Sequence, residues 1–120
     1  MKKTILVVDD EIEIGQQIKE FFEEKKIKVL VATEGKIGCE YARKKKPALV
    51  LLDIRLPDQD GIVCLSEIKK TCPDTMVIML TAIHDEDVAR LALKEGASDY
   101  LTKPFDLADL YERWVSPFFS

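Results

Sequence analysis

Short apolar runs rich in β-branched residues alternate with longer amphipathic stretches from one end of the chain to the other. Five runs are predicted strands, and they cover residues 4–8, 28–32, 49–52, 76–80 and, more weakly, 99–102. Because these runs are apolar on both faces, they suit a parallel sheet that is covered by helices on its two sides. The alternation predicts five βα units and therefore a doubly wound α/β domain.

Two apolar stripes at helical spacing mark predicted helices. The first consists of Ile14, Ile18, Phe21 and Phe22, and the second of Leu107, Leu110, Tyr111, Trp114 and Val115. Pro117 should end the second helix, because proline cannot continue the helical hydrogen-bond ladder. The phenylalanines that follow, Phe118 and Phe119, either fold back onto the core or stay exposed as a contact surface. For the helix before these, Asp85 is a predicted N-cap and Gly96 a predicted C-terminal stop.

The size and charge of the chain limit what it can do. A chain of 120 residues matches one domain, so residues 1–120 are expected to form a single unit whose output goes to another molecule. The apolar runs are far shorter than the roughly 18 residues of a membrane-spanning helix, and the cytoplasm is the expected location. The net charge of −4 argues against direct nucleic-acid binding. The one basic cluster, residues 43–46, falls at a predicted helix end, where cations suit the helix dipole.

The three cysteines, Cys39, Cys64 and Cys72, cannot all pair with one another, and none has the C-x-x-C spacing of a zinc or redox motif. Cysteine is also among the residue types most often buried. The three are therefore expected to be reduced thiols with a structural role.

Polar residues follow four of the five predicted strands. Asp9 and Asp10 come directly after the first strand, Asp53 after the third, Thr81 after the fourth and Lys103 after the fifth. In open parallel sheets the functional site lies beyond the carboxyl ends of the strands, where the strand order reverses. If the order is 2-1-3-4-5, the first and third strands are neighbours at that point, and their acidic ends converge.

Three carboxylates in one crevice would repel one another unless a cation lies between them. Mg²⁺ prefers oxygen ligands, and no histidine or cysteine near these positions suggests zinc. For Asp9 and Asp10 alone, capping of the helix that starts near Glu11 is an equally simple interpretation. The joint pattern with Asp53 favours the metal site.

Four segments resemble the receiver-domain family of bacterial two-component signalling in order and spacing. They are residues 5–11 (ILVVDDE), 51–61 (LLDIRLPDQDG), 79–82 (MLTA) and 99–105 (DYLTKPF), and the match covers essentially the whole chain. The resemblance implies a flavodoxin-like sheet of order 2-1-3-4-5 and a domain that is phosphorylated by a sensor histidine kinase or a phosphotransfer protein. It also implies Mg²⁺ or Mn²⁺ as the cofactor and a downstream protein target in trans.

The resemblance assigns the acceptor and metal roles as follows. Asp53 would be the phosphoacceptor, Asp9 and Asp10 the acidic metal pair with Asp10 a direct ligand, and the backbone carbonyl of Arg55 a further ligand. Chemistry agrees, because a carboxylate and a phosphate dianion repel each other, so Mg²⁺ and the ammonium of Lys103 are needed to stabilise charge on the phosphoryl oxygens. The product would be an aspartyl phosphate.

The resemblance further implies that Thr81 and Tyr100 switch position on phosphorylation and so couple the site to the surface of the fourth helix, fifth strand and fifth helix. Three of the site residues also have simpler interpretations. Thr81 could be a half-buried strand residue, Tyr100 a strand aromatic that packs on a neighbouring helix, and Lys103 a surface lysine at a strand end. The bond from Lys103 to Pro104 is expected to be cis, an isomer accessible chiefly before proline.

Three other functions compete with this one. A small phosphatase of the haloacid-dehalogenase type also uses aspartate, Mg²⁺, threonine and lysine, but it begins with Asp-x-Asp on the first strand, whereas the predicted nucleophile here follows the third. A flavodoxin-like flavin binder would need a glycine-rich loop to hold the flavin phosphate, and the sequence has none. Its acidic first loop would repel that phosphate. A degenerate receiver acting only as a protein-interaction module would be expected to lack some of the site residues.

Several neighbouring positions have more modest expected roles. Arg55 and Ile83 occupy positions that adjust phosphoryl lifetime in the family, and neither can orient an attacking water. His84 is expected to face solvent in a loop, and Asp58 and Asp60 are expected to be solvated turn residues rather than metal ligands.

The unphosphorylated protein is expected to be a monomer. Receivers that carry winged-helix domains often dimerise through ion pairs on the last strand and helices, and Asp99 with Arg113 could supply one such pair. Ala89 and Val115, however, stand where that branch has an arginine and a lysine.

Overall fold

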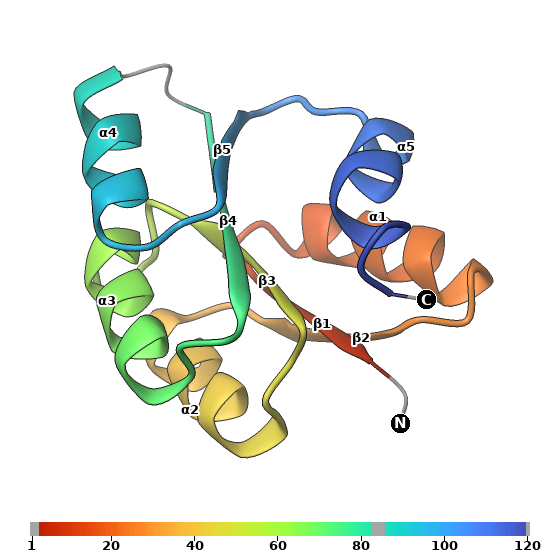
Figure 1. Cartoon of the computed structure of the whole chain (residues 1–120), viewed down its shortest axis with the longest axis horizontal. Coiled ribbons are helices and arrows are strands. Elements are labelled where there is room, and N and C mark those ends of the chain that lie inside the picture. Colours follow the sequence, from red (N-terminus) through yellow and green to blue (C-terminus); the bar gives the residue numbers. More distant parts are fainter. Residues whose placement is uncertain (1–2, 83–85, 120) are drawn as a thin grey trace.

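Five parallel strands form a single sheet in the computed structural model, which describes residues 3–82 and 86–119 (Figure 1). The strands are β1 (Thr4–Val8), β2 (Lys28–Ala32), β3 (Leu49–Asp53), β4 (Met76–Thr81) and β5 (Asp99–Thr102). Their order is β2-β1-β3-β4-β5, and every neighbouring pair is parallel. The predicted fold class and strand order are confirmed. β3 and β4 each extend one residue beyond the prediction, so that Asp53 and Thr81 still belong to the sheet.

Helices cover both faces of the sheet. They are α1 (Ile12–Glu24), α2 (Gly35–Lys45), α3 (Gly61–Thr71), α4 (Glu86–Lys94) and α5 (Leu107–Leu110), which continues as the five-residue π-helix Tyr111–Val115. In Figure 1, α1 and α5 lie on one side of the strands and α2, α3 and α4 on the other. Among residues 3–82 and 86–119, no helix is long and apolar enough to cross a membrane.

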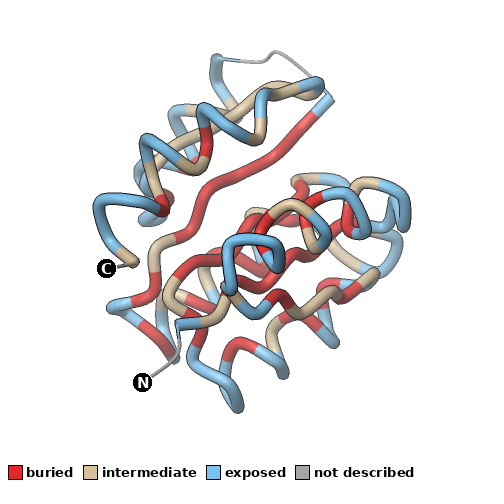
Figure 2. Tube along the Cα trace, turned by 90° about the vertical axis from the view of Figure 1, so that its right-hand side faces the viewer, coloured by how far each residue is buried: buried red, intermediate tan, exposed pale blue. Residues whose placement is uncertain are grey.

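Alternation along the strands divides the core into two layers. Ile5 and Val7 of β1 pack towards α1 and α5, whereas Leu6 and Val8 pack towards α2 and α3. β1 after Thr4 and all of β3 are buried, and Figure 2 shows the exposed positions concentrated on the outer turns of the helices and in loops. Full burial of one such aliphatic side chain stabilises the fold by about 1.5–3 kcal/mol. The central strands are therefore a rigid base for the residues that follow them.

Glycine is required at two places in the helical layers, once for a close approach and once at a helix end. A Cβ atom at Gly38 in α2 would lie 2.7 Å from Cγ2 of Val8, so only glycine lets this helix approach β1 so closely. Gly96 has a φ of +111°, a conformation that favours glycine, and it follows the end of α4 as predicted. The predicted N-cap of α4, Asp85, lies outside the described residues.

Asp58 and Asp60 stabilise helix starts, a role that the sequence analysis did not assign. The side chain of Asp60 accepts a hydrogen bond from the backbone N–H of Ile62 at 2.8 Å and caps α3. Asp58 accepts hydrogen bonds from the N–H groups of Lys36 (2.9 Å) and Gly35 (2.7 Å), which lower its pKa. The loop that follows β3 is therefore attached to the first turn of α2.

The C-terminal phenylalanines take different positions. Phe119 packs against the core layer on the α1 and α5 side, whereas Phe118 is 46% exposed and stacks on Trp114 with 6.2 Å between ring centroids. Helical structure ends at Val115, in agreement with the stop predicted at Pro117. Trp114 also donates a hydrogen bond to Asp99 at 3.1 Å.

Candidate functional site

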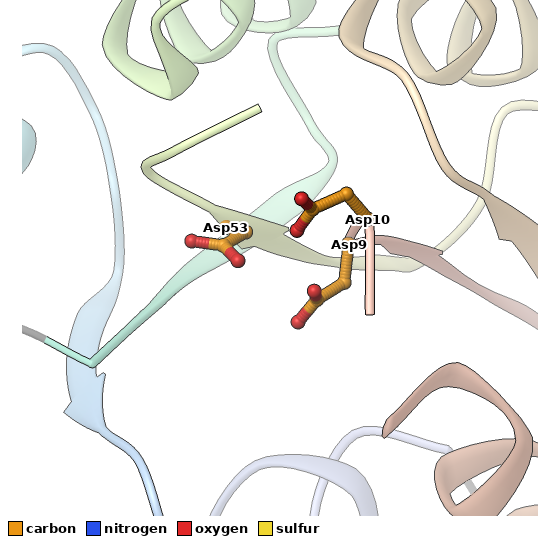
Figure 3. A group of neighbouring side chains, drawn as sticks. All are labelled: Asp9, Asp10 and Asp53. Atoms are coloured by element: carbon orange, nitrogen blue, oxygen red, sulfur yellow. The ribbon is translucent and has the colours of Figure 1, made fainter. Parts of the chain in front are cut away.

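Three carboxylates meet at the carboxyl ends of β1 and β3. Asp9 and Asp10 follow β1, and Asp53 is the last residue of β3 (Figure 3). One oxygen from each lies within 4.8 Å of the others. This follows from topology, because β1 and β3 are paired neighbours with Val8 in register with Leu52. The crevice predicted at the point where the strand order reverses is therefore present.

The ammonium of Lys103 contacts the carboxylate oxygens of three residues. Its Nζ atom is 2.7 Å from Oδ2 of Asp9, 3.0 Å from Oδ2 of Asp53 and 3.1 Å from Oε1 of Glu11. Burial alone would lower the pKa of this lysine, but its close contacts with these three carboxylates raise it above its usual value. The lysine is therefore positively charged across the physiological range. The peptide bond to Pro104 is cis, as predicted.

Asp9 is fully buried. Its Oδ1 atom accepts a hydrogen bond from the backbone N–H of Glu11 at 2.9 Å. Its Oδ2 atom is close to Lys103 but has no hydrogen bond of good geometry. Burial raises the pKa of Asp9 to about 6, although the adjacent positive charge of Lys103 opposes this shift. The N-cap of α1 is Glu11, so the alternative in which Asp9 or Asp10 caps this helix is not supported.

Asp53 faces a cavity of about 320 Å³. The cavity is lined by Asp10, Glu11, Asp53, Arg55, Thr81, Ala82 and Lys103. Oδ1 of Asp53 accepts a hydrogen bond from the backbone N–H of Arg55 at 3.0 Å, while Oδ2 contacts Lys103. A Cβ atom at Gly61 would lie 2.6 Å from the Cα of Ile54, so glycine is required for the chain to turn back beside Asp53. The carboxylate is thus held rigidly with one side open to a small ligand.

The charges of the site fit a hard divalent cation. Lys103 contacts the carboxylates of Asp9, Glu11 and Asp53. Asp10 adds a fourth carboxylate to the crevice, so negative charge is in excess. Carboxylate oxygens that converge within 4.8 Å are the ligand type that Mg²⁺ and Ca²⁺ prefer. The acidic cluster could therefore hold a metal ion.

The remaining predicted residues differ in their distance from this centre. Thr81 is 1% exposed and lines the cavity with Asp53, whereas Tyr100 is half-buried and packs against the core layer that contains Met79 and Ala92. Tyr100 therefore lies on the strand beside Thr81 but outside the cavity lining. Ile83 and His84 lie outside the described residues.

Glu11 is the site residue that sequence reasoning treated only as the start of a helix. Its carboxylate is 3.1 Å from Nζ of Lys103, although 92 positions separate the two residues. The available signal was its place directly after Asp9 and Asp10 at the end of the first strand. Proximity of that position to the fifth strand's loop could not be read from the sequence alone.

Comparisons with known proteins agree with this geometry. Residues 5–114 match the family model described as response regulator receiver domain. The chemotaxis protein CheY of Halobacterium salinarum is 37% identical over 105 residues, which cover 88% of each chain. The transcriptional regulatory protein CrdR of Helicobacter pylori is 35% identical over 121 residues, which cover all of this chain and 56% of that protein. The chain spans about half the length of the first curated relatives it matches.

A solved structure shows the same fold. A CheY-like response regulator receiver domain protein from Methanospirillum hungatei has a TM-score of 0.90 and 31% identity, with 93% of this chain and 90% of that chain covered. The family match covers residues 5–114. These residues include all five strands of the sheet and the acidic residues of the crevice. The chain belongs to the response regulator receiver domain family of two-component signalling.

Proposed function

We propose that this receiver accepts a phosphoryl group on Asp53 from a sensor histidine kinase or a phosphotransfer protein and passes the signal to a protein target in trans. The observation that carries the proposal is the position of Asp53. Its carboxylate lies 3.0 Å from the ammonium of Lys103 and within 4.8 Å of oxygens from Asp9 and Asp10, at a cavity open to a small ligand. A nucleophile, a cation and a potential metal site are therefore adjacent.

The proposed transfer is a simple displacement at phosphorus. A carboxylate oxygen of Asp53 bonds to phosphorus, while the bond from phosphorus to the donor's imidazole nitrogen breaks and the imidazole takes up a proton. Lys103 would move from the carboxylate oxygen to an oxygen of the arriving phosphoryl group, a short movement because it already contacts Asp53. The N–H of Arg55 holds the other carboxylate oxygen in place during the attack.

Mg²⁺, or Mn²⁺ in its place, is the proposed cofactor. Asp10, Asp53 and the backbone carbonyl of Arg55 would be direct ligands, with Asp9 as the buried member of the acidic pair. When bound, the ion would supply positive charge to the phosphoryl oxygens. The ammonium of Lys103, 2.7 Å from Oδ2 of Asp9, would offset part of the remaining negative charge of the pocket before and after transfer.

Thr81 and Tyr100 are the proposed switch. Thr81 lines the cavity, so its hydroxyl lies where a phosphoryl oxygen could come within reach, and Tyr100 lies on the paired strand beside α4. Movement of Tyr100 would alter the surface formed by α4, β5 and α5, which is the proposed contact for the target. A phosphatase of the haloacid-dehalogenase type is not favoured, because the family match covers residues 5–114.

Three further proposals concern the molecule's surroundings. The chain is proposed to act in the cytoplasm, as a monomer when unphosphorylated. Within the described residues, Arg113 pairs with Asp109 at 3.8 Å and Asp99 accepts a hydrogen bond from Trp114, so both members of the considered intersubunit pair have intramolecular partners. The net charge of −4 favours protein partners over nucleic acid for this segment.

Incubation with acetyl phosphate and Mg²⁺ is the direct test of this function. We expect intact-mass analysis to show addition of one phosphoryl group, about 80 Da, and peptide mapping to assign it to Asp53. The reaction should stop when EDTA replaces Mg²⁺, because the charge of the phosphoryl oxygens is then insufficiently stabilised. Equal labelling with and without metal would contradict the proposed cofactor, and labelling elsewhere would contradict the acceptor.

Mg²⁺ at ten times its dissociation constant should raise the melting temperature by roughly 5 °C at pH 7.5, since binding to the native state then stabilises it by about 1.4 kcal/mol. Asp10→Asn should lose most of this rise, whereas the exposed Asp74→Asn should keep it. Thermal unfolding of each protein with Mg²⁺ and with EDTA gives the comparison. An unchanged melting temperature in the wild type would count against the metal site.

The rise in melting temperature caused by Mg²⁺ should depend on pH. Because the pKa of Asp9 is raised from 3.8 to about 6 in the folded protein, its ionisation makes the metal-free fold less stable as pH rises through this range. Mg²⁺ favours the ionised form, so its stabilising effect should be large at pH 7.5 and small at pH 5. A rise that is equal at both pH values would show that Asp9 does not contribute to binding.

Thr81→Ala and Tyr100→Ala should still accept a phosphoryl group but should bind a target at least about tenfold more weakly after phosphorylation, because each removes part of the proposed switch. Labelling with acetyl phosphate measures the first property, and titration of the phosphorylated protein against its target measures the second. Leu93→Ala, at an exposed position of α4, controls for loss of surface contacts alone. If folded Thr81→Ala no longer labels, Thr81 belongs to the chemical step instead.

A further inference from the structure

Two cysteine thiols from different helices lie in direct contact, away from the residues of the proposed phosphorylation chemistry. Cys39 belongs to α2 and Cys64 to α3, and their Sγ atoms are 2.9 Å apart. Both are free thiols, as is Cys72. Cys72 instead donates to the carbonyl of Ala42 at 3.4 Å. The sequence predicted three structural thiols, and the contact between two of them was not predicted.

Surrounding contacts hold the two sulfur atoms close together. Sγ of Cys64 donates to the carbonyl of Gly35 at 3.6 Å, and Sγ of Cys39 donates to the carbonyl of Cys64 at 3.8 Å. The nearby attachment of Asp58 to the first turn of α2 fixes that helix further. A disulfide has sulfur atoms about 2.05 Å apart, so a bond requires the two atoms to approach by only ~0.9 Å.

One of the two thiols can be reached from solvent. Cys39 is half-buried and lines a cavity of about 500 Å³, whereas Cys64 is fully buried beneath it. Lys36 and Arg43 line this cavity together with the acidic residues Glu40, Asp58 and Glu67, so the lining carries charges of both signs. An attacking reagent would therefore meet Cys39 first and Cys64 only afterwards.

We propose that Cys39 and Cys64 form a redox-active pair that a low-molecular-weight disulfide such as oxidised glutathione converts into a disulfide between α2 and α3. The Cys39 thiolate attacks the reagent, which releases one thiol and leaves a mixed disulfide on Cys39. The Cys64 thiolate then attacks the sulfur of Cys39 and releases the second thiol. The two protein thiols lose two electrons in total, the reagent gains them, and the two thiol protons pass to the released thiols.

The reduced pair is stable enough to persist until an oxidant arrives. The hydrogen bond with Cys64 and burial raise the pKa of the Cys39 thiol, so little thiolate exists at neutral pH. Oxidation is therefore slower than that of an exposed cysteine. The second step is fast by comparison, because the attacking sulfur is already in contact with its target.

The crosslink would enclose the segment that carries Asp53, one part of the crevice. Residues 39–64 include β3 with Asp53 and the loop through Asp58, and oxidation would close this segment into a covalent ring. Closing a ring of this size restricts the unfolded chain and so stabilises the fold. The inference rests on the cysteine geometry alone and does not require Asp53 to be phosphorylated.

The test uses the full chain, equilibrated with mixtures of reduced and oxidised glutathione under native conditions. We expect a species about 2 Da lighter than the reduced protein, mapped to a Cys39–Cys64 crosslink, fully reversible by excess reduced glutathione and with a melting temperature higher by roughly 5–10 °C. Persistence of unmodified thiols, or accumulation of a glutathione adduct on wild-type Cys39 without ring closure, would overturn the proposal.

Matched variants separate the pair from general thiol chemistry. Cys72→Ala should form the crosslink and show the rise in melting temperature, because it leaves the contacting thiols unchanged. Cys64→Ala should stop at the mixed disulfide on Cys39. If this buried substitution prevents folding, Cys39→Ser at the half-buried position gives the second measurement, with no crosslink and no rise on oxidation. A crosslink that uses Cys72 in the wild type would show that the assigned pair is wrong.

Discussion

Asp53→Asn is expected to reduce labelling by acetyl phosphate by at least about 100-fold, to below detection by intact mass. Asparagine has nearly the same shape and keeps an oxygen that can accept the hydrogen bond from the N–H of Arg55, which is 3.0 Å long in this structure. It lacks the negative oxygen that would bond to phosphorus. The substitution therefore removes the nucleophile with little change to its surroundings.

Asp74→Asn is the matched control for this loss. Asp74 is exposed in the loop between α3 and β4, on the opposite edge of the sheet from the crevice, so this variant should label as fully as the wild type. Melting curves in EDTA should show that Asp53→Asn is folded and no less stable, because one of several mutually repelling carboxylates has been neutralised. Full labelling of folded Asp53→Asn would assign the phosphoryl group to another residue.

Lys103→Met should impair both stability and chemistry. At pH 7.5 in EDTA, the free energy of unfolding should fall by about 2 kcal/mol, because Asp9 and Asp53 lose the cation that lies within 3.0 Å of each. For a domain of this size the melting temperature should fall by roughly 7 °C. The labelling rate should fall by about 100-fold to 1,000-fold, the usual effect of removing one group that stabilises developing charge.

The loss of stability should depend on pH in a defined direction. A lysine whose pKa is raised in the folded state contributes its full stabilisation below its unfolded pKa, so the contribution of Lys103 is complete at pH 7.5. The nearby lysine holds the pKa of Asp9 down, so its removal raises that pKa further, and Asp9 takes up a proton as the pH falls towards 5. The variant should then approach the wild type in stability. Unfolding at pH 7.5 and at pH 5 measures this difference.

The exposed lysine of α4 provides the control. Lys94→Ala changes the net charge equally but removes no buried ion pair, so neither stability nor labelling rate should change appreciably. If Lys103→Met is as stable as Lys94→Ala at pH 7.5, the carboxylates of the crevice do not depend on this lysine. If its labelling rate is also normal, Lys103 has no part in the proposed transfer.

Most of the fold could be predicted because its signals are local. Runs such as residues 4–8 are apolar on both faces, and only a sheet covered on both sides buries them, so the α/β class followed from the sequence alone. Gly96 and the residues before it marked a helix end for the same reason, since a positive φ favours glycine. The positions of Asp9, Asp10, Asp53, Thr81 and Lys103 at strand ends then placed them on one edge of the sheet.

Contacts between distant segments were decided only by tertiary structure. Glu11 contacts Lys103, which lies 92 positions away. Asp58 is hydrogen-bonded to residues of α2 that lie 22 and 23 positions away, and Cys39 contacts Cys64 across 25 positions. Periodicity tells which face of a helix is buried, but not which side chain of a neighbouring helix it meets there. Those side-chain contacts depend on how whole helices and strands pack against one another, which fixes the distances between side chains to within about an ångström. The sequence by itself therefore determined the fold class and the edge of the sheet that carries the site, whereas packing determined the ion pairs and the thiol contact.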